Sequence, residues 1–542
     1  MWGSVPGMVA DAAARFGDAE AVVDGGRRLT FGQLSEQSVG VTRAMMAAGI
    51  EPGDRVALWA PNSASWVSAC LGALGAGAVL VPLNTRFKGP EAAYVLRRSG
   101  AKALFSVRGF LGIDYPGLLE GEDVPDLDRI VLFGDSEGDE SEPTTTDEVP
   151  VFGWAEFLAG ADGVVEAEGG VVGVPVSFHD ARNRWQSVSG DGLSDVIFTS
   201  GTTGAPKGVT ATHVQTLRTF AIWSRIVGLR HGDRYLVVNP FFHTFGYKAG
   251  ILACLMQGAT LVPQETFDVD RTLELIEAER ITVLPGPPTL YQSLLDHPAR
   301  GRHDLSSLRL AVTGAAVVPV ELVRRMESDL AFETVLTAYG LTEATGVVTM
   351  CRQGDAPEVV AHSSGRAIPG VEVRVADDDS NDVAPGNPGE VLVRGFNVTA
   401  GYFEDPQSTS EAIEADGWLH TGDIGVLDEA GNLRITDRKK DMFIVGGFNV
   451  YPAEVEQVLL RHPGVAQVAV VGVPDHRLGE VGRAYVVARS GSDPAVLPEE
   501  LLGWAADQMA NYKVPRSVEV LDALPTNASG KVLKTELRRG TP

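Results

Sequence analysis

Short apolar runs closed by glycine or proline recur along the first 370 residues of the chain. Two of them, GAVLVP at Gly77–Pro82 and GATLVP at Gly258–Pro263, each follow an apolar segment with helical character. β-branched runs of this length predict buried strands, and segments such as RTLELIEAER at Arg271–Arg280 predict amphipathic helices. The two similar units indicate two related α/β layers, although six matching residues can also arise by chance. Further runs that predict strands are VALWAP at 56–61, ITVLPGPP at 281–288 and LAVTGAA at 310–316.

The alternation of strands and helices predicts an α/β fold with mostly parallel sheets. Beyond residue 370 the pattern changes to short strands and turns, at 371–378, 389–395 and 431–438, which indicates a small part similar to a β-barrel. A polar joint, DRKKD, then leads into a small unit of helices and strands. We therefore expect an N-terminal domain at 1–437, a boundary at 438–440 and a small α+β C-terminal domain at 441–542.

One acidic stretch interrupts this order. Residues 135–148 contain seven acidic and no basic side chains, and a segment rich in glycine and valine follows them. Acidic runs of this kind are usually solvated loops. We therefore predict a surface insertion at about 135–190 and assign no function to it.

The composition excludes several classes of function. The 542 residues include 45 Lys and Arg against 71 Asp and Glu, a formal net charge of -26, which is the wrong sign for binding nucleic acid or anionic lipid. The three cysteines, Cys70, Cys254 and Cys351, are too far apart for a disulfide framework or a metal-ligand motif. Glycine and proline interrupt the longest uncharged stretch, at 61–85, which argues against a membrane span. Because the N-terminus has no pattern typical of a signal peptide, the sequence predicts a cytoplasmic protein.

The segment DVIFTSGTTGAPKGVTATH, at Asp195–His213, is the strongest candidate for chemistry. Its first residues predict a strand, and a glycine-rich turn leaves the carboxyl end of that strand, where α/β folds place ligands. Glycines allow peptide N–H groups to converge on an anion, and hydroxyl and lysine side chains add further donors. The composition matches a polyphosphate, whereas a flexible surface turn would explain only the glycines. The spacing G-x-x-G-x-x-K-G differs from that of the common phosphate loop of kinases and GTPases. The candidate phosphate-binding residues are Thr199, Ser200, Gly201, Thr202, Thr203, Gly204 and Lys207.

The stretch FTSGTTGAPKGV resembles the signature of the adenylate-forming superfamily of acyl-CoA synthetases, luciferases and nonribosomal adenylation domains. Further motifs of that superfamily follow in the same order, namely NPFFHTFGYKAG, TGAA, AYGLTEATG, GWLHTGDIG, DRKKDMFIVGGFNVYPAEVE and LPTNASGKVLK. The resemblance covers the whole chain except the predicted insertion. In such enzymes a carboxylate attacks the α-phosphate of ATP, pyrophosphate leaves, and a thiol then cleaves the acyl-adenylate.

The resemblance assigns roles around the nucleotide. It implies that Glu343 and Thr203 hold Mg²⁺, since oxygen donors suit this ion, and that Thr342 bonds the α-phosphate. It also implies that Asp423 accepts from the ribose hydroxyls. The further nucleotide contacts that it implies are Gly314, Ala315, Ala316, Tyr339, Gly340, Ile435 and Arg438.

Two parts of the C-terminal domain are implied to serve different steps. Lys531, in ASGKVLK, would lie between the carboxylate and the α-phosphate, where an opposite charge at 4 Å contributes about 4 kcal/mol at an effective dielectric constant of 20. Gly446 and Gly447, in GGFN, would line the channel for the pantetheine arm. Because one face cannot present both, the family rotates this domain, and the hinge at 438–440 maps to Lys440, a lysine as in luciferases rather than the frequent aspartate.

The resemblance also implies that the carboxylic acid substrate has no α-ammonium group. Relatives that activate amino acids place an aspartate near the position of Phe242, and this chain lacks it. His243 is either a catalytic base or an aromatic gate. Lys248 either extends to solvent or donates to a substrate oxygen. The resemblance implies a mostly apolar acyl pocket lined by His243, Thr244, Phe245, Gly246, Tyr247, Lys248, Leu284, Pro285, Gly286, Gly314 and Thr345.

Two segments, at 239–255 and 281–300, resemble actinobacterial ligases of steroid degradation within this superfamily. Those ligases activate the propionate side chain of a methyl-hexahydroindanedione. The sequence therefore predicts an AMP-forming acid–thiol ligase that uses ATP, Mg²⁺ and coenzyme A on such an acid. The alternatives left open are a ligase for medium- or long-chain fatty acids or aryl acids, and a stand-alone adenylation enzyme that loads a carrier protein. The oligomeric state is open, with a homodimer as one alternative.

Overall fold

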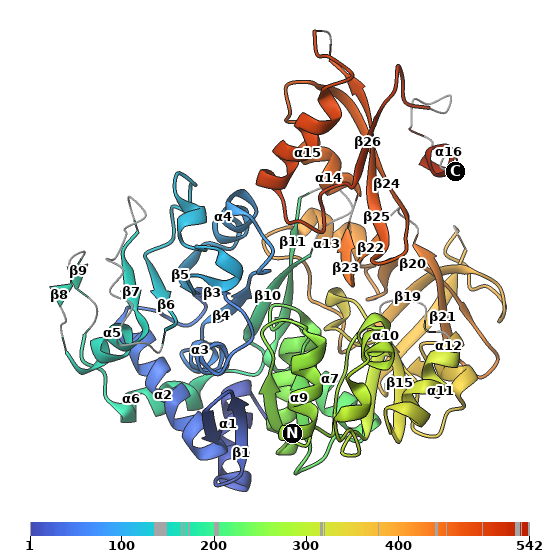
Figure 1. Ribbon diagram of the computed structural model, residues 1–542. Helices are drawn as coiled ribbons and strands as arrows, with labels where there is room; N and C mark the ends of the chain where they lie inside the picture. The colour runs from blue at the N-terminus through green and yellow to red at the C-terminus, as the bar shows by residue number, and fades with distance from the viewer. Residues whose placement is uncertain are drawn as a thin grey trace.

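The computed structural model describes residues 2–134, 149–163, 166–167, 170–171, 174–199, 205–314, 318, 320–377, 379–438, 443–450, 452–489, 491–525, 532 and 534–539. Figure 1 shows a large body formed by the residues up to β21 (Leu433–Arg438) and a smaller lobe above it, which contains β24 (Val465–Asp475), β25 (Gly479–Ala488) and α15 (Leu497–Gln508). Most buried apolar side chains up to Leu433 form one large core and a smaller cluster beside it. Those from Phe443 onward form a separate core. The predicted domain boundary at 438–440 falls between these regions and stays a prediction.

The first sheet of the large body has the strand order β11-β10-β4-β3-β5-β6-β7. Its inner strands run parallel, whereas β11 returns antiparallel to β10. The segment 61–85 forms a helix at Ala64–Gly75 followed by a buried strand at Val79–Pro82, as predicted. The strands are β3 (Arg55–Trp59), β4 (Val79–Pro82), β5 (Ala101–Ser106), β6 (Arg129–Leu132), β7 (Val151–Gly153), β10 (Leu193–Thr199) and β11 (Lys207–Thr212).

The second sheet consists of two four-stranded parts, β12-β13-β1-β2 and β14-β15-β16-β17. A single residue, Val283, joins them by pairing in parallel with Tyr235 of β12 and Leu310 of β14. The prediction of a strand over 281–288 is therefore wrong in length. The three prolines of this segment lack the N–H group that a longer strand ladder needs. The strands are β1 (Glu20–Asp24), β2 (Arg27–Thr30), β12 (Arg234–Val237), β13 (Thr260–Pro263), β14 (Leu310–Gly314), β15 (Thr334–Tyr339), β16 (Thr349–Met350) and β17 (Arg366–Ala367).

Helices cover these sheets. The predicted amphipathic helix at 271–280 lies at Val269–Ala278, because Asp268 accepts from the backbone N–H of Arg271 and caps its start. The helices of the large body are α1 (Val5–Phe16), α2 (Phe31–Ala47), α3 (Ala64–Gly75), α4 (Gly89–Ser99), α5 (Trp154–Ala159), α6 (Phe178–Ser187), α7 (His213–Val227), a π-helix (Phe245–Leu252), α8 (Ala253–Gln257), α9 (Val269–Ala278), α10 (Pro288–Asp296), α11 (Val320–Asp329), α12 (Pro357–His362) and α13 (Pro406–Ala412).

The surface insertion predicted at about 135–190 is wrong for a large part of its length. Strand β7 extends the first sheet, and helix α6 packs against α2. Trp185 of α6 is buried and donates through Nε1 to the Thr42 hydroxyl of α2 at 2.6 Å. These parts are built into the fold because their aromatic side chains complete the core beneath α2. Two short strands, β8 (Glu166–Ala167) and β9 (Gly170–Val171), pair with each other, and 135–148 lie outside the described residues.

The expected small β part and the C-terminal lobe are both present. An antiparallel sheet of β18 (Val371–Ala376), β19 (Gly389–Gly395), β20 (Leu419–Leu427) and β21 (Leu433–Arg438) completes the large body. In the lobe, helices pack against a mixed sheet of its own. Its elements are β22 (Phe443–Val445), β23 (Phe448–Val450), α14 (Pro452–Leu459), β24 (Val465–Asp475), β25 (Gly479–Ala488), α15 (Leu497–Gln508), β26 (Ser517–Val520) and α16 (Lys534–Arg539).

Candidate active site

Three predicted nucleotide-binding residues lie at the carboxyl ends of strands. Thr199 ends β10, Gly314 ends β14 and Tyr339 ends β15. Thr199 pairs directly with Lys207, the first residue of β11, so the two ends of the glycine-rich segment lie side by side. Gly314 pairs with Ala338, next to Tyr339. Seven further predicted nucleotide contacts lie outside the described residues, namely Ser200, Gly201, Thr202, Thr203, Gly204, Ala315 and Ala316.

Tyr402 brings two predicted site residues together. Its hydroxyl donates to Oε1 of Glu343 at 3.1 Å, and the Nζ atom of Lys207 lies 5.1 Å from the centre of its ring. The backbone beside it is fixed to β11, since Phe403 donates its N–H to the Gly208 carbonyl at 2.7 Å. Tyr402 is not among the residues predicted from the sequence. No motif marks it, because its importance comes from partners far away along the chain.

Asp423 is buried and lies against Tyr339. The Tyr339 hydroxyl donates to Oδ2 of Asp423 at 2.6 Å, which orients this carboxylate beside the predicted adenine contact. Asp423 pairs with Arg438 across β20 and β21, and Ile435 of β21 pairs with Gly425. The strand ladder thus brings the predicted ribose-binding residues to one edge. Gly340 and Thr342 follow Tyr339 directly, at the start of the turn that carries Glu343.

The predicted acyl pocket is centred on the π-helix Phe245–Leu252. Gly246 is required there, because a Cβ atom would lie 2.2 Å from the Pro240 carbonyl oxygen. π-helical turns occur frequently at functional sites. His243, just before this helix, is exposed, and its Nδ1 accepts from the backbone N–H of Phe245 at 3.2 Å. A neutral ring then carries its proton on Nε2. Thr244 and Tyr247 are buried, and Phe245 is partly buried.

The interpretation that Lys248 extends to solvent is wrong, and donation to a substrate oxygen stays a prediction. Its side chain is only 1% exposed, and its Nζ atom lies 2.8 Å from Oδ1 of Asp195, which is equally buried. The Ser194 hydroxyl donates to the other carboxylate oxygen at 2.6 Å. Lys248 therefore reaches inward to strand β10 instead of reaching solvent. No local pattern in the sequence marks this pair, since the two residues lie 53 positions apart.

Four further predicted pocket residues, Leu284, Pro285, Gly286 and Thr345, are buried. Leu284 and Gly286 donate their N–H groups to Leu310 and Val312, and Pro285 accepts from the Asn239 amide. The Thr345 hydroxyl donates to the Asn397 carbonyl at 2.7 Å. These hydrogen bonds fix the backbone around the predicted pocket. The contact of these residues with the acid stays a prediction.

The turn with Gly446 and Gly447 lies at the junction of the two lobes. Both glycines have left-handed φ angles, of 55° and 87°, which the tight turn between β22 and β23 requires. Phe448, which follows them, stacks on Tyr512 with ring centres 4.6 Å apart. The Tyr512 hydroxyl accepts from the Asn84 amide of the large body at 3.0 Å. Lys440 and Lys531 lie outside the described residues.

The described residues contain no cluster of three or more His, Cys, Asp or Glu side chains that could hold a metal ion. Within the same part of the chain, no helix has the length and hydropathy needed to cross a membrane.

Comparison with known families decides the class of the chain. The profile of the AMP-binding enzyme family matches residues 9–403, and that of the AMP-binding enzyme C-terminal domain matches residues 454–531. The chain belongs to the AMP-binding enzyme family. It is 50% identical over 536 residues, 99% of this chain and 98% of the relative, to the 3-[(3aS,4S,7aS)-7a-methyl-1,5-dioxo-octahydro-1H-inden-4-yl]propanoyl:CoA ligase of Rhodococcus jostii. A ligase of the same name from Mycobacterium tuberculosis is 50% identical over 535 residues, with the same shares covered. This AMP-binding enzyme is an AMP-forming acyl-CoA ligase, whose substrates are a carboxylic acid, ATP and CoA.

Two solved structures of one relative bear on the arrangement of the lobes. This AMP-binding enzyme is similar to o-succinylbenzoate CoA synthetase (MenE) from Bacillus subtilis, with 27% sequence identity. A double mutant of MenE bound with its product analogue OSB-NCoA matches with a TM-score of 0.80, and the alignment covers 98% of each chain. MenE in complex with the acyl-adenylate OSB-AMP matches with a TM-score of 0.65, over 98% of this chain and 97% of that one. Over the whole chain, both lobes included, the structure therefore superposes better on the product-analogue complex than on the acyl-adenylate complex.

Proposed function

We propose that this ligase activates the propionate side chain of the bicyclic 7a-methyl-1,5-dioxo-octahydroindene that names its two relatives. The supporting observation is the 50% identity to both over nearly the whole chain. The acid carries two keto groups on an apolar bicycle, and the buried, mostly apolar π-helix suits one wall of the predicted pocket for such a shape. The absence of an aspartate near Phe242 agrees with an acid that has no α-ammonium group.

In the first step, a carboxylate oxygen attacks the α-phosphorus of ATP. A new P–O bond forms, the bond to pyrophosphate breaks, and an acyl-adenylate results. Lys207 and Lys531 are proposed to stabilise the charge on the phosphates, and Thr342 to bond the α-phosphate. The aromatic contact with Tyr402 keeps the Lys207 ammonium beside the strand end where this chemistry is proposed to occur.

In the second step, the thiol sulfur of CoA attacks the acyl carbonyl carbon. A C–S bond forms, the C–O bond to AMP breaks, and the thiol proton leaves to solvent. The turn with Gly446 and Gly447 is proposed to admit the pantetheine arm, because Phe448 beside it lies at the junction of the lobes through Tyr512 and Asn84. The predicted role of His243 as a base is not needed for this step.

The donor set fits the proposed Mg²⁺. Glu343 supplies a carboxylate, a hard oxygen donor, and Tyr402 orients it. Glu343 is proposed to hold the ion together with Thr203. When bound, Mg²⁺ would neutralise part of the phosphate charge. A cytoplasmic location and a homodimer also stay predictions.

The experiment that tests this function is ATP–pyrophosphate exchange by the purified protein with a panel of acids. The panel contains the bicyclic propanoate, palmitate, benzoate and ferulate, and each reaction is repeated with CoA to detect the thioester. We expect the bicyclic acid to give the highest kcat/KM and to yield a CoA thioester. Faster exchange with palmitate or benzoate would overturn the substrate assignment. Exchange without any thioester would point to a carrier protein as acceptor.

A further inference from the structure

Helix α4 carries three polar side chains on one of its faces. Glu91, Tyr94 and Arg98 stand at positions i, i+3 and i+7 of Gly89–Ser99, so they share one face of the helix. Each of them binds a different part of the chain. Because a helix rises 1.5 Å per residue, this face spans about 10 Å from Glu91 to Arg98.

The start of α4 holds the C-terminal lobe. Oε1 of Glu91 lies 2.8 Å from Nζ of Lys513, and Oε2 accepts from the backbone N–H of Ala510 at 2.9 Å. Lys513 is almost fully buried and also pairs with Glu454 of its own lobe at 2.6 Å. Burial opposes the charge of Lys513, but Glu454, Tyr512 and Glu91 together raise its pKa above the ordinary value. Through Glu91, the large body therefore contacts the buried ammonium group of Lys513 in the lobe.

The middle of α4 holds the exit of the glycine-rich segment. The Tyr94 hydroxyl donates to the Pro206 carbonyl at 3.1 Å, one residue before Lys207. Tyr94 is half-buried, and burial raises the pKa of its hydroxyl. A hollow of about 140 Å³ beside this bond is lined by Tyr94, Arg98 and the segment 205–208, among others.

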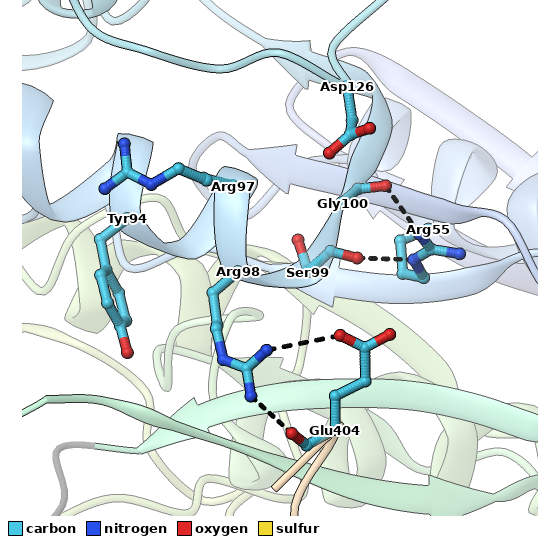
Figure 2. Close-up of a pocket in the computed structure, with 8 residues that line it drawn as sticks. All are labelled: Arg55, Tyr94, Arg97, Arg98, Ser99, Gly100, Asp126 and Glu404. Atoms are coloured by element: carbon cyan, nitrogen blue, oxygen red, sulfur yellow. Dashed lines mark hydrogen bonds and ion pairs between the residues drawn. The ribbon is translucent and has the colours of Figure 1, made fainter.

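The end of α4 holds the segment next to Tyr402. Arg98 donates to the carbonyls of Phe403 and Glu404 and also binds the Glu404 carboxylate, as Figure 2 shows for Glu404. Arg98 and Tyr94 border a second hollow, of about 280 Å³. Through this contact α4 also supports the residue that orients Glu343.

We propose that α4 couples the docking of the C-terminal lobe to the phosphate-binding segment, with Glu91 and Tyr94 as positioning residues at its two contacts. This inference rests on the proposed two-step function. In the present arrangement, which is similar to the product-analogue complex of MenE, Lys513 and Ala510 bind Glu91. When the C-terminal lobe rotates away, Glu91 loses the hydrogen bonds from Lys513 and Ala510. Helix α4, which contacts Pro206 and the segment 403–404, is then no longer fixed by the lobe. Neither residue touches the reacting atoms.

The test uses Glu91→Gln, Tyr94→Phe and the double variant in the full chain. Glutamine still caps the start of α4, where Glu91 accepts from the Lys88 N–H, but it removes one of the two carboxylate charges that Lys513 faces, the other being that of Glu454. Each variant is assayed in two half-reactions, ATP–pyrophosphate exchange and transfer of preformed acyl-adenylate to CoA. We expect Glu91→Gln to slow the transfer about tenfold, the size of a lost hydrogen bond to a charged group, and to leave exchange within about twofold. We expect Tyr94→Phe to raise the KM for ATP in exchange about threefold and to slow the transfer as well.

Coupling through α4 is measured by a double-mutant cycle on the transfer rate. The combined loss in the double variant should be at least about threefold smaller than the product of the two single losses. Multiplicative losses, or an equal loss of both half-reactions in Glu91→Gln, would overturn the proposal.

The matched control is Arg97→Gln. Arg97 stands on the same helix, but in Figure 2 it points away from Arg98 and Glu404, and its partner is the exposed Asp123. We expect this variant to change neither half-reaction by more than about twofold. The cycle uses whichever acid gives the fastest exchange, so a wrong acyl assignment would not affect it, whereas absence of exchange with every acid would contradict the proposed function itself.

Discussion

Lys248 and Asp195 form an ion pair that is almost completely removed from solvent, with Nζ 2.8 Å from Oδ1. The pair ties the π-helix of the predicted acyl pocket to strand β10, four residues before Thr199. A buried charge left without its partner is costly, whereas removal of both charges is often tolerated. The pair therefore connects the acyl side of the predicted site to the strand that leads into the phosphate-binding segment.

Lys248→Met should destabilise the protein by about 3–5 kcal/mol, because it leaves the Asp195 carboxylate buried without its ammonium partner. Urea unfolding followed by fluorescence measures this change. The double variant Lys248→Met with Asp195→Leu should recover most of the loss. A double variant no more stable than Lys248→Met would show that the pair does more than neutralise two buried charges.

Tyr402→Phe should raise the KM for MgATP in pyrophosphate exchange roughly tenfold, because the variant loses a hydrogen bond to the charged Glu343. Transfer of preformed adenylate to CoA should change much less. The control is Tyr485→Phe, which removes a buried hydroxyl that donates to the Leu537 carbonyl in the C-terminal lobe. An unchanged KM in Tyr402→Phe would mean that Glu343 does not depend on this tyrosine.

His213 should make the protein less stable in mild acid. Burial, together with the nearby Lys248 ammonium, lowers the pKa of His213 from 6.5 to about 4. Since the unfolded chain binds this proton more tightly, the contribution of His213 to stability is complete above pH 6.5 and is lost as the pH falls towards 4. The loss amounts to about 3 kcal/mol for a shift of this size. Unfolding free energies measured between pH 7 and 4 should fall less steeply in His213→Gln, and parallel curves for the two proteins would contradict this assignment.

Lys440→Pro tests the predicted hinge. We expect adenylate formation to continue and thioester formation to stop, because proline restricts the backbone at the residue about which the C-terminal lobe would rotate. Exchange and transfer are measured separately on the same preparation. An equal loss of both half-reactions would argue against rotation of the lobe.

The sequence was sufficient for the elements that have a local signal. The runs at 77–82 and 258–263 are strands, because β-branched residues bounded by glycine and proline carry that information in a few positions. The glycine-rich segment and the motifs that follow it identified the family for the same reason. The run at 281–288 has apolar residues, but its prolines reduce it to the single bridging residue Val283.

The sequence was not sufficient for contacts between distant residues. The sequence left open whether Lys248 extends to solvent or donates to a substrate oxygen, and it did not predict the ion pair with Asp195. Glu91 and Lys513 are 422 positions apart and show no pattern that links them. The part of the predicted insertion around Trp185 was assigned to the surface because composition alone does not reveal that an aromatic side chain packs against α2.

The most direct test of the proposed chemistry follows an oxygen atom. The acid is labelled with ¹⁸O in its carboxylate and converted to the CoA thioester by the purified enzyme with ATP, and the nucleotide product is analysed by mass spectrometry. If the carboxylate attacks the α-phosphorus, one ¹⁸O atom is transferred to AMP. Unlabelled AMP, or ADP with label in inorganic phosphate, would contradict an acyl-adenylate pathway.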